Sequence, residues 1–361
     1  MLFLGVGCSS RPTTADAEPS AVPPEPARHE FSRLLMGVQA RIVLFHEDVA
    51  VAEEAANAAF DRIAGLDAIL SDYRVDSEVN RLCTFAGTGE VVPVSDDLFE
   101  VLKRSIEFSR ASGGAFDVTV GPVVALWREA RRSGVIPSRQ EIDRAMQSVG
   151  WERIELLDDS GVPWANSGLP VAERSIDSEP RASEALAHGT QNQWTRRVRL
   201  LAPGMRLDFG GIGKGYACDE ALKVLRAFDC SRALVEMGGD IALGDPPPGE
   251  PPLWIVLPAD EDPEERWSPL DDPESFERIM SLSNCGVGTS GDRFQYIEFD
   301  GVRYSHVIDP RTGWGVRDAH ESTVIAADAT TADALATAVG VLGIEAGAAM
   351  VDQFVGARII E

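Results

Sequence analysis

Residues 207–217 read Leu207-Asp208-Phe209-Gly210-Gly211-Ile212-Gly213-Lys214-Gly215-Tyr216-Ala217. The pattern predicts a strand over 206–209, a glycine-rich loop over 210–215 and a helix over 216–228. Glycine lets the backbone approach a ligand closely, and the start of a helix presents free N–H groups, so this turn suits a pyrophosphate. Its spacing is neither the Rossmann fingerprint nor a P-loop. On spacing alone, a plain tight turn is an equally good interpretation.

Helices and strands surround this stretch without regular alternation. Strands are predicted over 40–45, 153–157, 198–201, 233–237, 254–257, three segments within 288–308, and 322–327. Helices are predicted over 49–71 and 96–112, from Ser138 with a capping box to Glu141, and from about Ala332. This order predicts an α+β fold, with a mixed β-sheet and packed helices in one domain over 31–361. Residues 158–196 lack periodicity and are predicted to be an insertion loop.

Composition excludes some functions. The chain has 361 residues, 44% of them hydrophobic, so it can bury a full core. Its 33 basic and 58 acidic residues give a net charge of -25. Such a charge repels nucleic acids, so we predict no nucleic-acid partner. A phosphate-bearing ligand would need positive charge supplied locally by a metal, a helix N-terminus or a few placed cations.

The first 30 residues predict export. The stretch MLFLGVGCSS is apolar up to Cys8, and a Ser-, Pro- and Ala-rich run follows it. This is similar to a bacterial lipoprotein signal with a flexible tether, so we expect a lipidated Cys8 that holds the protein on a membrane surface facing the periplasm. The alternative is a disordered tail with a chance cysteine. The other cysteines match no zinc pattern, and their pairing stays open: Cys83, Cys218, Cys230 and Cys285.

Two oxygen-bearing side chains share one side of the helix near Ala332. Asp333 and Thr337 are four residues apart, so both point to the same side near the start of that helix. Carboxylate, hydroxyl and backbone carbonyl oxygens are the ligands that Mg²⁺ prefers. An ordinary alternative is that Asp333 complements the dipole of its own helix and Thr337 bonds back to the backbone.

His306, one of five histidines, is the candidate proton acceptor. Alternation along its strand predicts that it shares a face with Tyr304 and Ile308, while Asp309 lies opposite. A lone strand histidine is more often structural. Tyr73 and Phe116 lie at the ends of elements, where an aromatic ring either stacks on a flat heterocycle or covers the core.

Together these segments resemble the FAD:protein FMN transferase family, ApbE, from Met36 onward. The resemblance rests on motifs that occur in the family's order: Met36-Gly37, LSDY (70–73), SEVNRL (77–82), SGGAFDVTVGP (112–122), LDFGGIGKGYA (207–217), GGDI (238–241), TSGD (289–292), YSHVIDPRTG (304–313) and ADALAT (332–337). Gly213 stands where many members have Ala. Three further departures are Val38, Cys83 and Arg293.

The resemblance implies a site, residue by residue. The FAD-binding positions would be Met36, Tyr73, Ala115, Phe116, Asp117, Gly210, Lys214, Tyr216 and Val307, with Tyr73 against the isoalloxazine. The Mg²⁺ ligands would be the carbonyl of Gly213 and the side chains of Asp333 and Thr337. His306 would be the catalytic base. FAD is then the substrate and Mg²⁺ the cofactor.

The implied reaction attaches FMN from FAD to a threonine hydroxyl and releases AMP. The acceptor would be an exported, flavin-carrying redox subunit. Two alternatives stay open: a pyrophosphatase on the same scaffold that splits FAD into FMN and AMP, and a lipoprotein that binds FAD without chemistry. Nothing in the residues predicts the oligomeric state.

Overall fold

The computed structural model describes residues 26–157, 196–249, 254–256, 280–291, 296–299, 301–317 and 321–360. Cys8 and residues 158–195 of the predicted insertion loop lie outside these ranges. Within them, no helix combines the length and apolar character needed to cross a bilayer.

A seven-stranded sheet lies at the centre, with strand order β1-β2-β6-β7-β10-β14-β15. Its strands are β1 (Ala27–Leu35), β2 (Val38–His46), β6 (Ala233–Met237), β7 (Asp240–Leu243), β10 (Cys285–Ser290), β14 (Ser322–Ala326) and β15 (Arg358–Ile360). The predicted α+β class is confirmed, but the sheet differs from the mixed one predicted. Every pair of neighbours in it is antiparallel. Tight turns such as 238–239 join strands that follow each other in sequence, and only antiparallel strands can be joined so closely.

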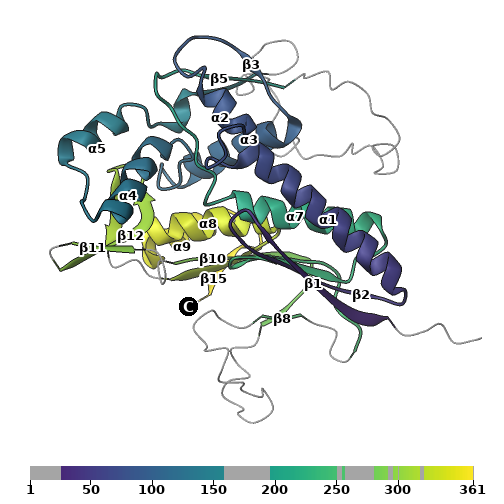
Figure 1. Cartoon of the computed structure of the whole chain (residues 1–361). Coiled ribbons are helices and arrows are strands. Elements are labelled where there is room, and N and C mark those ends of the chain that lie inside the picture. The colour runs from purple at the N-terminus through teal and green to yellow at the C-terminus, as the bar shows by residue number, and fades with distance from the viewer. Residues whose placement is uncertain are drawn as a thin grey trace, which may run out of the picture.

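Helices cover one face of this sheet (Figure 1). They are α1 (Val49–Leu70), α7 (Gly213–Ala227) and α8 (Ala329–Leu342), with α9 (Ile344–Val351) packed on α8. Alternation along β2 sends Ile42 and Leu44 into the core beneath the helices. Val43 points to the opposite face, where it packs in a small cluster with Trp254 of β8 (Trp254–Val256). β8 pairs with β9 (Met280–Leu282).

Smaller elements flank the helical layer. They are α2 (Glu78–Cys83), α3 (Asp96–Ala111), α4 (Gly121–Ser133), α5 (Arg139–Met146), a 3-10 turn (Trp151–Arg153), and the strands β3 (Val92–Pro93), β4 (Ile154–Leu157) and β5 (Arg197–Leu200). A second sheet contains β11 (Tyr296–Phe299), β12 (Val302–Asp309) and β13 (Trp314–Arg317). α5 begins with the predicted capping box between Ser138 and Glu141. Buried Trp127 of α4 packs against Tyr304 of β12, and its indole N–H donates to the carbonyl of Gly313 at 2.9 Å.

The stretch 206–217 differs from its prediction in two ways. Residues 206–209 are not a strand, although Leu207 and Phe209 alternate into the core. They are held instead by a single bridge of Arg206 to Val120 and by the amide of Asp208, which donates to the Val118 carbonyl at 2.8 Å. In addition, α7 begins at Gly213, three residues earlier than predicted. The second half of the glycine-rich segment is therefore the first turn of a helix.

Candidate active site

α7 and α8 cross with their backbones in contact. A Cβ atom placed on Gly215 would lie 2.3 Å from the carbonyl oxygen of Ala329 and 2.9 Å from the Cβ of Asp333. Non-bonded carbon and oxygen atoms do not approach that closely, so only glycine fits between the two helices. The first turn of α7 is thereby pressed against α8.

Each helix caps the first turn of the other. Oδ2 of Asp333 in α8 accepts a hydrogen bond from the Gly215 amide in α7 at 3.0 Å. In return, Asp219 in α7 accepts from the amides of Ala329 (2.9 Å) and Thr330 (2.8 Å) at the start of α8. Amides of a first turn have no partner within their own helix, so these carboxylates satisfy donors that would otherwise be buried unpaired. Burial, together with the nearby charge of Asp328, raises the pKa of Asp219 to about 6.

Asp333 does not lie at the N-terminus of its own helix, where a carboxylate would complement the helix dipole. The N-cap of α8 is Asp328, whose side chain accepts from the Thr331 amide at 2.7 Å. Asp333 lies one turn further on and caps α7 instead. The ordinary alternative that the sequence left open for Asp333 is therefore wrong, because α8 begins three residues earlier than predicted.

Thr337 meets the glycine-rich turn. A Cβ atom on Gly211 would lie 2.7 Å from Oγ1 of Thr337, so this hydroxyl sits directly against the loop. Asp333 and Thr337 thus face the segment 211–215 in succession, on one side of α8 as their spacing predicts. Gly213 lies in the chain between Gly211, which meets Thr337, and Gly215, which meets Asp333. A Cβ on Gly213 would meet Met36 Cε at 3.9 Å. The structure therefore brings Met36, Gly213, Asp333 and Thr337 to one place.

Lys214 is not a free positive charge. Its ammonium group forms an ion pair with Oδ2 of Asp240, which is fully buried at the start of β7. Burial disfavours the ammonium form, but the carboxylates of Asp240 and Asp333 outweigh that effect and raise the pKa of Lys214 above its usual value.

One lysine therefore serves two buried carboxylates. Burial raises the pKa of Asp240 to about 8; the charge of Asp333 adds to this rise, and Lys214 opposes it. Burial also raises the pKa of Asp333. Oδ1 of Asp240 is buried without a hydrogen-bond partner among the described residues. Such a cluster is short of positive charge, and a bound cation would supply it.

His306 and Val307 lie in an irregular part of β12. The pairing of β12 with β13 shifts register between Tyr304 and Ile308. Tyr304 and Ser305 are consecutive and both buried, whereas His306 and Val307 are half-buried. The placing of His306 on the face of Tyr304 and Ile308 stays a prediction, because the register shift interrupts the regular alternation on which it rests. Bulges re-aim side chains and often occur beside active sites.

Tyr73 is the exposed aromatic residue among the predicted ligands. The residue is 74% exposed at the turn after α1. The guanidinium of Arg128 lies 4.1 Å from the ring centroid. Tyr73 therefore has the accessibility that stacking on a flat ligand requires.

Four other predicted FAD-binding residues are buried, whereas Gly210 is exposed. Ala115 and Phe116 are buried, and Phe116 packs edge-on against Phe108. Asp117 accepts from the amides of Thr119 (2.8 Å) and Trp151 (3.0 Å), and burial raises its pKa. The Tyr216 hydroxyl donates to Asp97 at 2.8 Å. Gly210 is exposed, and its amide donates to Oδ1 of Asp208 at 2.8 Å.

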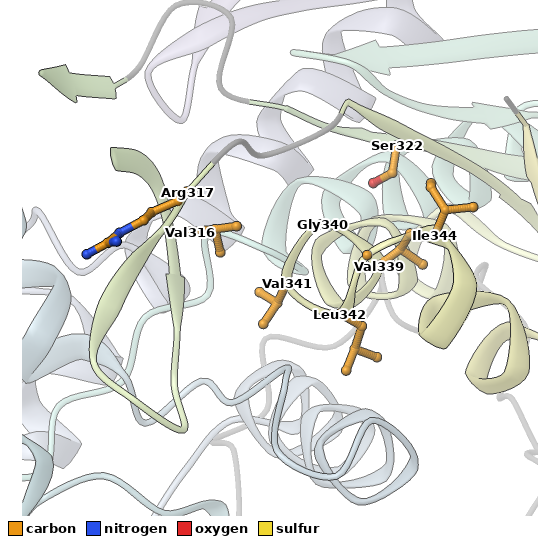
Figure 2. A pocket seen from close by; sticks show the side chains of 9 residues that line it. Val316, Arg317, Ser322, Val339, Gly340, Val341, Leu342 and Ile344 are labelled. Carbon is orange, nitrogen blue, oxygen red and sulfur yellow. The ribbon is translucent and has the colours of Figure 1, made fainter. Parts of the chain in front are cut away.

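A cavity of about 320 Å³ opens elsewhere, at the C-terminal end of α8. Figure 2 shows Val316 and Arg317 of β13 across from the last turn of α8 and Ile344. The cavity contains none of the predicted site residues in its lining.

Cysteine and carboxylate clusters do not suggest another metal centre. The four cysteines left open by the sequence are free thiols: Cys83, Cys218, Cys230 and Cys285. Among the residues that the structure describes, no group of three or more His, Cys, Asp or Glu side chains could hold a metal ion. The predicted Mg²⁺ ligands are a different kind of set, because only one of them is a carboxylate and the others are a hydroxyl and a backbone carbonyl.

Sequence reasoning missed the partners that organise the site. Asp240 belongs to the GGDI motif, but the motif alone predicts no role for it. No sequence motif marks Asp219 or Arg128. Asp219 could not be predicted because the donors that it pairs with are distant in sequence. Its partners in α8 lie 110 and 111 residues away in the chain.

Comparison with known proteins gives consistent matches. The model of the ApbE family matches residues 36–359. A FAD:protein FMN transferase of Treponema pallidum is 31% identical over 91% of this chain and 83% of its own length. One of Salmonella typhimurium is 27% identical over 95% and 85%.

Solved structures agree. The apo form of the flavinyl transferase ApbE of Pseudomonas stutzeri matches with a TM-score of 0.68 and 27% identity, over 91% of this chain and 89% of that one. The ApbE protein of Thermotoga maritima matches with a TM-score of 0.69 and 28% identity, over 92% and 93%.

Proposed function

The chain belongs to the ApbE family, and we propose that it is a FAD:protein FMN transferase that uses Mg²⁺ and attaches FMN to a threonine hydroxyl of another protein. One observation carries the proposal. Asp333 and Thr337 of α8 converge on the glycine-rich start of α7, in a chain whose relatives carry this enzyme's name.

The start of α7 is the place for the FAD pyrophosphate. The segment 210–213 precedes and opens the helix, where the helix dipole favours an anion. The amides of Gly210, Ile212 and Gly213 donate within the protein, so the dipole carries this argument more than free N–H groups do. Gly210 is exposed there, and glycine lets a phosphate approach the backbone. In a protein with a net charge of -25, whose Lys214 is already paired with Asp240, this helix dipole would act on the phosphates together with a bound cation.

The residues present fit a hard divalent cation. Asp333, Thr337 and the Gly213 carbonyl would hold Mg²⁺, because all three offer oxygen. The buried carboxylates of Asp333 and Asp240, with only Lys214 between them, have raised pKa values that a cation would lower again. When bound, Mg²⁺ would supply Lewis-acid polarisation of the phosphate oxygens.

His306 would take the proton of the acceptor hydroxyl. The threonine oxygen then forms a bond to the FMN-side phosphorus, the bond from that phosphorus to the bridging oxygen breaks, and AMP leaves with this oxygen. The products are a phosphoester-linked FMN, AMP and a proton held at His306. The exposed side chain of Tyr73 would stack on the isoalloxazine and so orient the FMN half of FAD.

The test is an assay with purified protein, FAD, Mg²⁺ and a threonine-containing fragment of a flavin-carrying redox subunit. We expect AMP in solution and an FMN adduct on the fragment by mass spectrometry, and no adduct when its threonine is replaced by alanine. AMP with free FMN and no adduct would support the pyrophosphatase instead. FAD binding without any AMP would support a flavin-binding protein without chemistry.

The place of action is part of the proposal. We expect the chain to be exported and held at a membrane surface through a lipidated Cys8, where it meets an exported acceptor. A Cys8→Ser variant should leave the membrane fraction while its activity on a soluble acceptor fragment is kept. A variant that stays in the membrane fraction would refute the anchor.

A further inference from the structure

We propose that Arg128 is a positioning residue that holds the Tyr73 ring and ties it to the glycine-rich turn, so that the two ends of the flavin site move as one unit. The inference rests on the proposed function, because it assumes that Tyr73 and the turn bind the same FAD molecule.

Arg128 lies against the ring of Tyr73. Its guanidinium carbon is 4.1 Å from the ring centroid, well within the range of a cation–π contact. The Tyr73 residue is 74% exposed, whereas the Arg128 side chain is only 24% exposed. The cation thus supports one face of the ring from the protein side and leaves the ring accessible to a ligand.

Arg128 is itself fixed by two carboxylates. Its Nη1 donates to Oδ2 of Asp72, the residue next to Tyr73, and its Nη2 donates to Oδ2 of Asp208 at 2.8 Å. The planar guanidinium fork is suited to such a double contact, and a lysine cannot reproduce it. Both carboxylates are mostly buried, so solvent screens the ion pairs little.

Asp208 continues the connection to the turn. Its other oxygen, Oδ1, accepts from the Gly210 amide at 2.8 Å. An unbroken series of contacts therefore runs from the Tyr73 ring through Arg128 and Asp208 to Gly210. A displacement of Arg128 would release the ring and loosen the first residue of the turn together.

The backbone of the Tyr73 turn has a separate support. The side-chain amide of Asn80 donates to the carbonyls of Asp72 (3.0 Å) and Arg74 (2.7 Å). Arg128 also projects from α4, whose Trp127 is anchored in the cluster beside β12. Asn80 and Trp127 therefore hold the turn and the helix independently of the guanidinium. Because Arg128→Met leaves Asp72 and Asp208 without their cation, its free energy of unfolding is measured beside FAD binding to separate positioning from stability.

The experiment compares Arg128→Met with Arg132→Gln. Arg132 is an exposed arginine on the same helix, and it forms an ion pair with Glu129. Titration of FAD gives the dissociation constant. We expect Arg128→Met to weaken FAD binding about 10-fold, from the lost cation–π and ion-pair contacts. The dissociation constant of Arg128→Lys should lie between those of the parent protein and Arg128→Met. That of Arg132→Gln should equal the parent value.

A second measurement needs no FAD. The chain has four tyrosines, so ¹⁹F NMR of 3-fluorotyrosine-labelled protein resolves few signals, and Tyr73→Phe assigns that of Tyr73. We expect Arg128→Met to shift and sharpen this signal as the ring gains freedom, and Arg132→Gln to leave it unchanged.

Two outcomes would overturn the inference: an unchanged Tyr73 signal in Arg128→Met, or unchanged FAD binding in the same variant. Equal losses of stability and turnover, with FAD binding intact, would show a structural role only. If the parent protein transfers no flavin, the proposed function fails, whereas a Tyr73 signal that responds to Arg128 would still uphold the contact.

Discussion

The two ends of the site are built in different ways. At the α7–α8 crossing, backbone touches backbone at Gly215, and the carboxylates of Asp333 and Asp219 satisfy the first turns of both helices. At the other end, Tyr73 is largely exposed, and only the side chains around it hold its ring.

The difference shows which parts of the site the fold determines and which parts single side chains determine. The phosphate end cannot change without disturbing two helices and the sheet beneath them, because no space separates their backbones. The Tyr73 side chain itself can change at little cost in stability, because it is largely exposed. We therefore expect substitutions at the crossing to affect folding and those at the ring to affect ligand affinity.

The largest effect should come from Gly215→Ala. The added methyl group would lie 2.3 Å from the Ala329 carbonyl oxygen, so we expect a loss of about 3 kcal/mol in the free energy of unfolding, or no soluble protein. Gly213→Ala is the matched control. Its methyl group would meet Phe209 Cβ at 3.5 Å, and alanine favours a helix, so this variant should be as stable as the parent or up to about 1 kcal/mol more stable. Urea unfolding that gives both variants the same stability would break the comparison.

Substitutions of Asp333 distinguish its effect on stability from its effect on turnover at the α7–α8 crossing. Asp333→Asn keeps an oxygen that can accept from the Gly215 amide but removes the charge, so we expect stability within about 1 kcal/mol and a loss of Mg²⁺-dependent turnover of about 100-fold or more. Asp333→Ala should lose about 1–3 kcal/mol as well, because the amide is left buried without a partner. Turnover of Asp333→Asn at the parent rate would refute the ligand assignment.

Tyr73→Leu probes the ring end. Because the side chain is exposed, we expect stability to change by less than about 0.5 kcal/mol, while the loss of stacking weakens FAD binding about 10-fold. Calorimetry and a fluorescence titration measure the two quantities. A large loss of stability would mean that the ring end is as structural as the crossing.

The last effect concerns pH. The pKa of Asp219 in the folded protein is about 6, above its ordinary value of 3.8, so the folded state binds this proton more tightly than the unfolded state. The contribution of Asp219 to stability is therefore present at low pH and is lost as pH rises from about 4 to about 6. Asp219→Asn should remove this dependence of the unfolding free energy on pH. Parallel stability curves for the two proteins would contradict the shift.

Much of the fold follows from periodicity, and the exceptions have physical causes. α1 and α3 match their predictions within a residue at each end, because their apolar spacing and N-caps are local signals. Residues 206–209 alternate like a strand because Leu207 and Phe209 point into the core, but only one bridge pairs them. α7 begins early because Asp333, distant in sequence, caps a first turn that two glycines would otherwise disfavour.

The candidate site was predicted unevenly for the same reason. The four-residue spacing of Asp333 and Thr337 places them correctly on α8, and the glycines mark a close approach that the structure contains. The ion pair of Lys214 with Asp240 joins positions 26 residues apart, and the contacts of Arg128 join α4 to two other segments. No local pattern encodes such pairs. The register shift beside His306 likewise depends on the pairing of β12 with β13.

The most direct test of the account is the stoichiometry of transfer at this crossing. AMP release and FMN bound to the acceptor threonine are measured in one reaction with FAD and Mg²⁺, for the parent protein and for Asp333→Asn. We predict one AMP for each FMN on threonine with the parent protein, and neither product with the variant or with EDTA. AMP released without FMN on threonine, or equal transfer by Asp333→Asn, would contradict the account.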